Sequence, residues 1–126
     1  MILADTSVWI EFLKGREKYF ESFDDLLKQK QIIAVECVFG ELLQGTRSHE
    51  ERELIRAYWE HLPKIDDRGL WLVAGEFSSD GQWHSKGVGL IDLFLYAVAR
   101  KYQFRIWTLD KKLKSLFSTD EIFDRV

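Results

Sequence analysis

Apolar residues recur along the chain in two patterns, short continuous runs and longer segments with helical spacing. The continuous runs predict short buried strands, and apolar positions three or four residues apart predict amphipathic helices. The predicted strands cover residues 2–4, 32–35, 62–65, 105–109 and 121–123, the last of them at a sheet edge. The predicted helices cover residues 8–13, 20–27, 38–43, 54–61, 70–83 with a break at Gly81, 90–102 and 111–117.

Strands in this prediction alternate with helices or helix pairs. That order is typical of an α/β fold, in which a parallel sheet carries helices on both faces. In such sheets, ligands bind in the crevice at the carboxyl ends of the strands. Polar residues that directly follow the predicted strands are therefore the candidates for a functional site.

The composition indicates one folded domain. The chain has 126 residues, 46% of them hydrophobic, and a single proline. Because no segment of the sequence resembles a Gly/Ser-rich linker, we predict a single domain over residues 1–126. Cys37, the only cysteine, lies in an apolar segment, which favours a buried thiol and a reducing cytoplasm. We expect neither a signal peptide nor a membrane span, because the apolar runs are too short.

Two aspartates stand where predicted strands end. Asp5 directly follows residues 2–4, and Asp110 directly follows residues 105–109. Each is also explained as a helix N-cap, a position for which aspartate is among the best residues. Because both belong at the carboxyl edge of a parallel sheet, their positions favour a shared site.

Three further acidic residues compete for a place in that site. Asp92 is the only charged residue among residues 88–99, and a carboxylate is costly to bury unless it is paired or bound to a metal. Asp92 also falls in the first turn of its predicted helix, where the macrodipole favours an anion, so a purely local role stays open. Glu41 points away from the apolar face of residues 38–43, which predicts a solvated side chain, whereas Glu36 lies nearer the edge of that face.

Carboxylates that converge repel one another, which raises their pKa values unless cations are present. Mg²⁺ prefers oxygen ligands and is often shared with phosphate oxygens. One or two such ions activate water and neutralise charge at a phosphodiester. The net charge of −3 does not argue against this chemistry, because bound cations reverse the local field. The residues by themselves thus predict an acidic metal site suited to phosphate chemistry.

Four segments together resemble the PIN-domain family, and within it the VapC-type toxins of toxin–antitoxin pairs. They are residues 1–15 (MILADTSVWIEFLKG), 41–45 (ELLQG), 87–92 (GVGLID) and 108–113 (TLDKKL). Their order and spacing match over nearly the whole chain, although residues 93–97 (LFLYA) differ from the Ile-Ala-Ala that often follows the third acid in the family. The resemblance implies a three-layer α/β/α sandwich around a central, mainly parallel sheet of four to five strands.

The same resemblance implies a Mg²⁺- or Mn²⁺-dependent endoribonuclease. The implied quartet of metal-binding and catalytic acids is Asp5, Glu41, Asp92 and Asp110. Thr6 and Thr108 are implied as supporting polar groups. The expected partners are an RNA substrate, a small antitoxin protein and a second copy of the chain in a homodimer.

Basic residues near these segments are candidates for contacts with an RNA backbone. They are Lys86, Arg100, Lys111 and Lys112. None of the three histidines has the spacing of a metal site. Two alternatives to a toxin ribonuclease stay open, namely a non-catalytic module that binds RNA or protein, and another metal-dependent phosphodiesterase such as a DNA nuclease.

Overall fold

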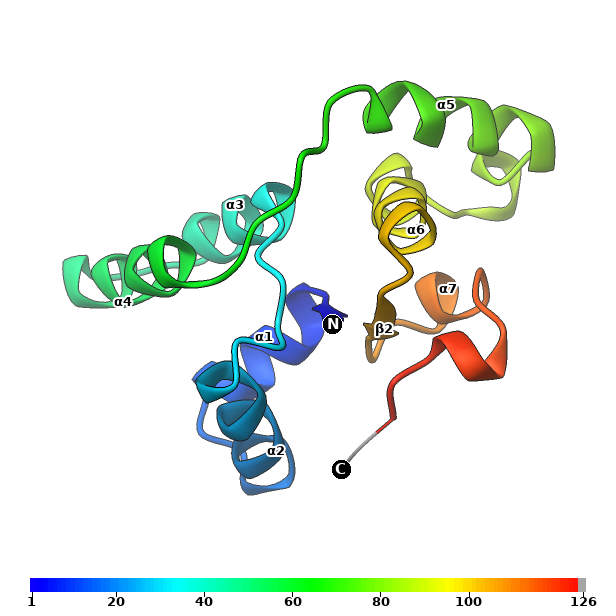
Figure 1. Cartoon of the computed structure of the whole chain (residues 1–126). Coiled ribbons are helices and arrows are strands. Elements are labelled where there is room, and N and C mark those ends of the chain that lie inside the picture. The colour runs from blue at the N-terminus through cyan, green and yellow to red at the C-terminus, as the bar shows by residue number, and fades with distance from the viewer. Residues whose placement is uncertain (125–126) are drawn as a thin grey trace.

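Two short parallel strands run through the middle of the fold (Figure 1). In the computed structural model, which describes residues 1–124, β1 (Ile2–Ala4) pairs with β2 (Arg105–Trp107). The register places Ala4 opposite Trp107, and the N–H of Asp5 donates to the carbonyl oxygen of Trp107 over 3.1 Å. Because the strands are parallel, both end at the same edge, and the turns that follow them start side by side.

The sheet has fewer strands than the sequence predicts. The other predicted strand segments make only isolated parallel bridges, which join Ile2 to Ile32, Ala34 to Lys64, and Ile106 to Ile122. Among residues 1–124, a central sheet of four to five strands is therefore not confirmed. The segments are too short to extend the pairing, because a helix begins directly after Val35 and Pro63 offers a carbonyl oxygen but no N–H.

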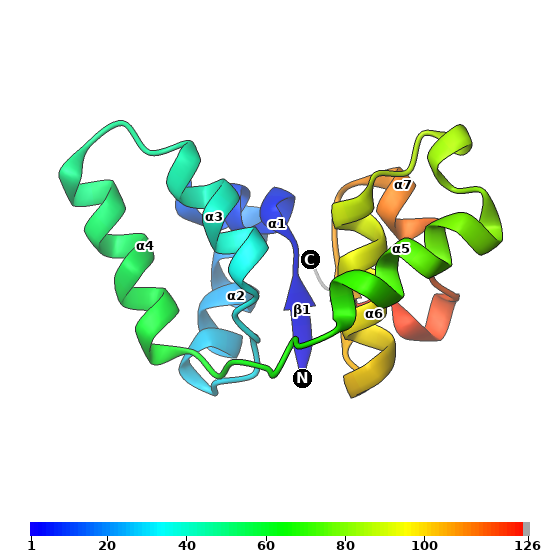
Figure 2. The same cartoon turned by 90° about the horizontal axis from the view of Figure 1, so that it is seen from above.

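Helices make up most of the described chain. They are α1 (Thr6–Leu13), α2 (Glu17–Lys28), α3 (Glu36–Gln44), α4 (His49–His61), α5 (Leu70–Gly81), α6 (Leu90–Tyr102) and α7 (Lys111–Lys114), with two 3₁₀ helices, η1 (His84–Lys86) and η2 (Thr119–Glu121). Figure 2 shows α1–α4 on one side of β1 and α5–α7 on the other. The α/β class and the helices on both sides of the strands agree with the prediction. Across residues 1–124, no helix is both long and apolar enough to cross a bilayer.

The ends of several elements differ from the prediction for local reasons. Asp5 caps α1, so this helix begins at Thr6 rather than at residue 8. β2 stops at Trp107 rather than at residue 109, because the next residues turn toward the end of β1. The last predicted helix ends at Lys114 rather than at residue 117, and the predicted edge strand at 121–123 reduces to η2 and the single bridge at Ile122.

Aromatic side chains fill the space between the strands and the first four helices. Trp9 is 1% exposed, and its ring packs edge-on against four neighbouring rings at centroid distances of 4.8 to 6.1 Å. These neighbours are Phe12, Phe23, Phe39 and Tyr58. Burial of each such side chain stabilises the fold by roughly 1.5–3 kcal/mol. The cluster therefore fixes α1, which carries the first candidate site residues.

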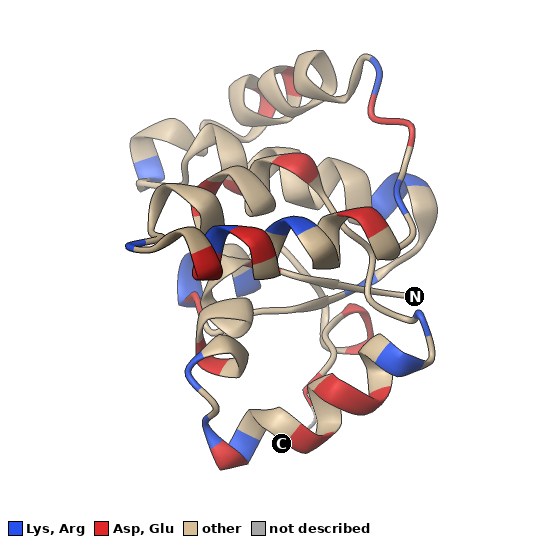
Figure 3. Cartoon of the chain, turned by 90° about the vertical axis from the view of Figure 1, so that its left-hand side faces the viewer, with Lys and Arg blue, Asp and Glu red and all other residues tan. Residues whose placement is uncertain are grey.

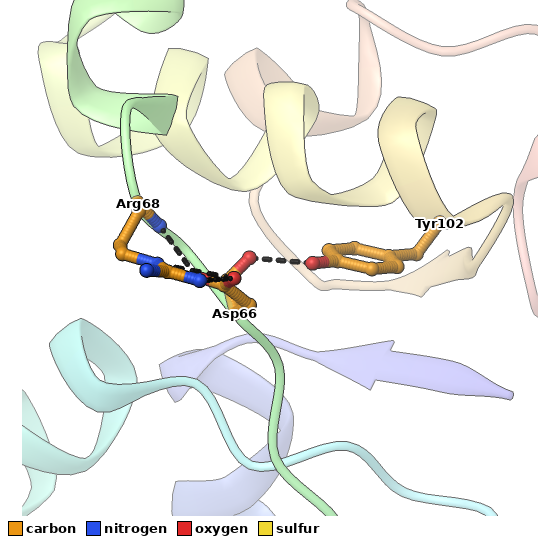
Figure 4. Close-up of polar contacts among 3 residues, drawn as sticks. All are labelled: Asp66, Arg68 and Tyr102. Carbon is orange, nitrogen blue, oxygen red and sulfur yellow. Dashed lines mark hydrogen bonds and ion pairs between the residues drawn. The ribbon is translucent and has the colours of Figure 1, made fainter.

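The connector between α4 and α5 is tied to the far end of α6. The Tyr102 hydroxyl donates to the carbonyl oxygen of Asp66, and the Asp66 carboxylate accepts from the Arg68 guanidinium at 2.6 to 3.1 Å (Figure 4). These hydrogen bonds from Arg68 hold the pKa of the Asp66 carboxyl well below its usual range. An exposed ion pair adds little stability. The bond from Tyr102 therefore ties the connector to α6 more effectively than the exposed ion pair does.

Tyr102→Phe is expected to lower the free energy of unfolding by about 1 kcal/mol, since it removes one hydrogen bond and keeps the ring. Urea denaturation followed by circular dichroism checks this value. Tyr19→Phe is the matched control, because the Tyr19 hydroxyl makes no side-chain hydrogen bond to residues 1–124. Equal losses of stability in the two variants would contradict this account of the connector.

Candidate metal centre

A cavity of about 330 Å³ opens at the carboxyl ends of β1 and β2. Carboxylates from four separate segments line it, namely Asp5 after β1, Glu41 on α3, Asp92 in the first turn of α6 and Asp110 before α7. The other lining residues are Thr6, Ser7, Ile10, Ile91 and Leu95. The structure thus brings together all four acidic residues of the predicted quartet.

Asp5 is the most deeply buried of these carboxylates, with 7% of its surface exposed. Its Oδ1 accepts from the Ser7 hydroxyl at 2.5 Å and from the N–H groups of Ser7 and Val8 at 3.1 and 3.4 Å. Its Oδ2 accepts from the Thr108 hydroxyl. Burial raises the pKa of the Asp5 carboxyl, and these hydrogen bonds oppose that rise.

Two hydroxyls join the turn after β1 to the turn after β2. Ser7 Oγ accepts from the N–H of Leu109 at 3.0 Å, and Thr108 Oγ1 accepts from the N–H of Asp110 at 2.9 Å. A hydroxyl has only one proton, so each directs it toward Asp5 while its lone pairs face the backbone donors. The family resemblance predicts Thr108 near the site, whereas Ser7 is a site residue that the sequence motifs do not predict. The sequence feature that indicates Ser7 is its position two residues after Asp5, where a serine side chain forms local capping hydrogen bonds.

Asp5 and Asp110 serve both as helix caps and as cavity residues. Oδ1 of Asp110 accepts from the N–H groups of Lys112 and Leu113 at 2.8 and 3.4 Å, which caps α7. Asp5 caps α1 in the same manner. The capping role and the shared site were alternatives in the sequence analysis, and the structure contains both because a carboxylate has room for several donors.

Glu41 reaches the cavity from the exposed side of α3. The Thr6 hydroxyl donates to its Oε1 at 2.8 Å. The spacing of apolar residues correctly predicts an exposed Glu41, and the exposed side of α3 here borders the cavity. Glu36 is exposed as well, but it is not among the residues that line the cavity.

Asp92 carries the clearest sign of crowded negative charge. Burial is the main cause that raises the pKa of its carboxyl, and the charge of Asp110 is the next. Asp5 and Glu41 raise it further, while a hydrogen bond from the backbone of Gly89 acts in the opposite direction. Like charges raise a pKa only when they lie close to the titrating group. The four carboxylates therefore act on one small region.

The donor atoms around the cavity suit a hard divalent cation, because they are carboxylate and hydroxyl oxygens. Within residues 1–124, no three side chains of the types that ligate metals lie close enough to bind one ion directly. Mg²⁺ meets this condition easily, since it keeps several waters and is held by one or two carboxylates together with phosphate oxygens. Asp92 and Asp110 are the residues that would hold such a hydrated ion.

Lys111, Lys112 and Lys86 belong to two segments that adjoin cavity residues in the sequence. Lys111 and Lys112 directly follow Asp110 at the start of α7. A side chain at Gly87 would meet Nζ of Lys112 at 3.2 Å, which places this amine beside the loop before α6. Lys86, the residue before Gly87, belongs to the same loop region.

Arg100 lies elsewhere. It follows Asp92 by eight residues, about 12 Å along α6, and it pairs with Glu121 at 3.6 Å. The structure therefore does not bring Arg100 to the cavity. Figure 3 shows Lys and Arg positions interspersed with Asp and Glu positions along the helices on that side of the fold.

The thiol and the histidines take no part in lining the cavity. Burial, together with the nearby charge of Glu41, raises the pKa of the Cys37 thiol to about 12. This thiol is therefore protonated and unreactive at neutral pH. His49 pairs with Glu53 at 3.6 Å on the exposed surface of α4.

An acidic cavity at the carboxyl ends of parallel strands defines a candidate site for metal-assisted phosphate chemistry. The family model described as the PIN domain matches residues 2–126. The chain therefore belongs to the PIN-domain family, as the four sequence segments predict. PIN domains are generally nucleases and typically use divalent metals. The comparison with curated proteins gives no match.

In the metal-free protein, Asp92→Asn is expected to raise the free energy of unfolding at neutral pH. A carboxyl whose pKa is raised by folding prefers its protonated form, so its ionisation destabilises the fold as the pH rises through that pKa. The stabilisation by asparagine should be full at pH 7 and absent near pH 3, where Asp92 is neutral too. Thermal unfolding in EDTA at the two pH values measures it.

Glu76→Gln on α5 is the control for that measurement, since Glu76 is exposed and does not line the cavity. It should change the unfolding temperature little at either pH. A destabilised Asp92→Asn variant at pH 7, or a gain of the same size at pH 3, would show that burial and the neighbouring charges do not raise the pKa of Asp92.

Proposed function

We propose that this protein is a Mg²⁺- or Mn²⁺-dependent endoribonuclease that acts in the cytoplasm as the toxin of a toxin–antitoxin pair. The observation that carries the proposal is the meeting of four carboxylates, each from a different segment of the chain, around one cavity. The raised pKa of Asp92 supports it, since burial and the neighbouring negative charges disfavour the ionised carboxylate, and those same charges favour a bound cation. The four-segment resemblance to VapC-type toxins supports RNA as the substrate.

In this proposal, the position of each residue determines whether it binds the ion or orients a ligand of the ion. Asp92 and Asp110 would hold the ion, together with Asp5 through water. When bound, the ion activates water and neutralises charge on the phosphodiester. Ser7 and Thr108 fix the Asp5 carboxylate in one orientation, so that it need not reorganise when substrate arrives.

Two further parts of the cavity have roles in this proposal. Glu41, held by Thr6, would orient water from the opposite wall. Lys111 and Lys112 would bind the phosphates on either side of the scissile bond, since they follow Asp110 directly.

A small antitoxin is the partner that this proposal requires. A groove of about 530 Å³ between α1, α3 and α4 supports a protein partner, because it shares Ile10 and Glu41 with the acidic cavity. A segment seated there would also block access to the metal centre. For the proposed homodimer, the exposed apolar side chains Trp71, Leu72 and Leu90 on α5 and α6 are the surface that supports association.

Purified protein is expected to cut RNA only with Mg²⁺ or Mn²⁺, and chelation should abolish the cleavage until metal is restored. Asp5→Asn and Asp92→Asn should each reduce the rate at least about 100-fold, because even the partners of metal ligands typically contribute 10- to 100-fold. Rates on a labelled RNA, the matching DNA and a phosphomonoester identify the substrate class. Glu76→Gln is the control, with the rate of the wild type.

Three results of this assay would count against the proposal. Equal rates for wild type and both aspartate variants would remove the carboxylates from the mechanism. Faster cleavage of DNA would make the protein a DNA nuclease. Tight RNA binding without any cleavage, at any metal concentration, would favour the non-catalytic module.

Expression of the wild type without its partner is expected to arrest bacterial growth, because uncontrolled RNA cleavage stops translation. The Asp92→Asn variant at the same expression level should allow normal growth. Colony counts after induction, with protein levels measured in parallel, test the toxin assignment separately from the nuclease activity. Normal growth with an active ribonuclease would reject the toxin role alone.

A further inference from the structure

A second small cavity, of about 310 Å³, lies on the α5–α7 side of the fold. We refer to it as the aromatic pocket, and its lining residues are Phe77, Asp80, Gly81, Trp83, Tyr96 and Leu116. Its three aromatic rings are only partly buried, so parts of them face the cavity. Cavities of this volume are at the lower end of the range for small-molecule sites, which suits one planar group.

We propose that the aromatic pocket binds an unpaired nucleobase of the RNA whose phosphodiester bond lies in the acidic cavity. The proposal rests on the ribonuclease activity proposed above and adds to it a recognition site for a base. A single-stranded nucleic acid binds typically through bases stacked on aromatic side chains and phosphates held by basic ones. Both kinds of group occur here, since the pocket has three aromatic residues and Lys86 lies over the Trp83 ring.

The pocket adjoins the metal centre along two elements. Tyr96 follows Asp92 on α6 by four residues, about 6 Å along the helix axis. Leu116 follows α7, whose N-cap is Asp110. A nucleotide next to the scissile bond is thus within reach of the pocket.

Two basic side chains lie beside residues 83–87, the segment that leads from the pocket toward the start of α6. Nζ of Lys86 lies 4.5 Å from the centre of the Trp83 ring. Nζ of Lys112 lies beside Gly87, the residue after Lys86. These two amines would bind the phosphate that connects the scissile bond to the base in the pocket.

The charges favour a neutral base over other occupants. Lys86 already lies over Trp83, and the guanidinium of Arg100 lies 5.5 Å from the Tyr96 ring centre, so an incoming cation would be repelled. Asp80 would repel a phosphate, but its carboxylate accepts hydrogen bonds from the exocyclic amino groups of adenine, cytosine or guanine. Uracil has no such group, which predicts weaker binding of uracil in the pocket.

Gly81 is required for the shape of the pocket. A Cβ at this position would lie 2.2 Å from Nε1 of Trp83, so the indole would have to move. Gly81→Ala therefore displaces the ring without removing it. This substitution provides a second way to disturb the pocket besides Trp83→Leu.

The test is RNA binding measured by fluorescence anisotropy in EDTA, where no cleavage occurs. Trp83→Leu is expected to weaken binding of a short labelled RNA by about five- to 150-fold, the range for loss of one stacked base. Trp59→Leu is the matched control, since the Trp59 ring also lies under a lysine, with Nζ of Lys64 5.0 Å from its centre, and Trp59 lies outside the pocket. An abasic nucleotide at the recognised position should weaken binding to the wild type but not to Trp83→Leu.

Several outcomes would overturn the proposal. One is wild-type affinity in both Trp83→Leu and Gly81→Ala, with folding of each variant confirmed by circular dichroism and thermal unfolding. Others are equal effects of an abasic nucleotide on wild type and Trp83→Leu, and competition by tetramethylammonium but not by a nucleoside monophosphate. Absence of RNA binding by the wild type would also reject it.

The two proposals can fail separately. RNA binding that depends on Trp83, without any cleavage in Mg²⁺ or Mn²⁺, would support the proposed base site and reject the proposed nuclease activity. Metal-dependent cleavage, with RNA affinity and KM unchanged in Trp83→Leu, would support the proposed nuclease activity and reject the proposed base site.

Discussion

The hydrogen bonds to the buried carboxylate of Asp5 hold the candidate site together. Asp5 is a cap for α1, but its two oxygens also receive the hydroxyls of Ser7 and Thr108, which are fixed in turn by backbone N–H groups of the β2–α7 turn. This arrangement depends on the parallel register of β1 and β2, which ends both strands at one edge. A buried carboxylate is thereby satisfied, and two turns that are distant in sequence are joined.

The other carboxylates lie close to Asp5 and lower the stability of the metal-free protein. Asp92 enters the same region from the first turn of α6, and its raised pKa reflects both burial and the charges around it. Without a cation, this crowding disfavours the folded state at neutral pH. A bound divalent ion makes the electrostatic contribution to folding favourable, because the carboxylates are then attracted to the ion. Membership of the PIN-domain family agrees with this interpretation.

Much of the fold follows from apolar spacing, and much of the site from position along the strands. The helical spacing of residues 90–102 predicts both ends of α6 correctly. Residues 32–35 form only single bridges, because a strand extends only where a neighbouring segment is available to pair with it, whatever its own β propensity. Asp5 and Asp110 were predictable because strand ends meet at one edge. The apolar spacing predicts an exposed Glu41, and the family resemblance assigns it to the acidic quartet. The packing of α3 accounts for both, because its exposed side borders the cavity.

The most direct test of the shared cation site is a crystal structure of the wild type grown with Mn²⁺, with data collected at a wavelength where manganese scatters anomalously. We predict an anomalous peak inside the cavity at the carboxyl ends of the strands, bound directly or through water to Asp92 and Asp110. Saturating Mn²⁺ with no peak in that cavity, while the four carboxylates are well ordered, would contradict the account.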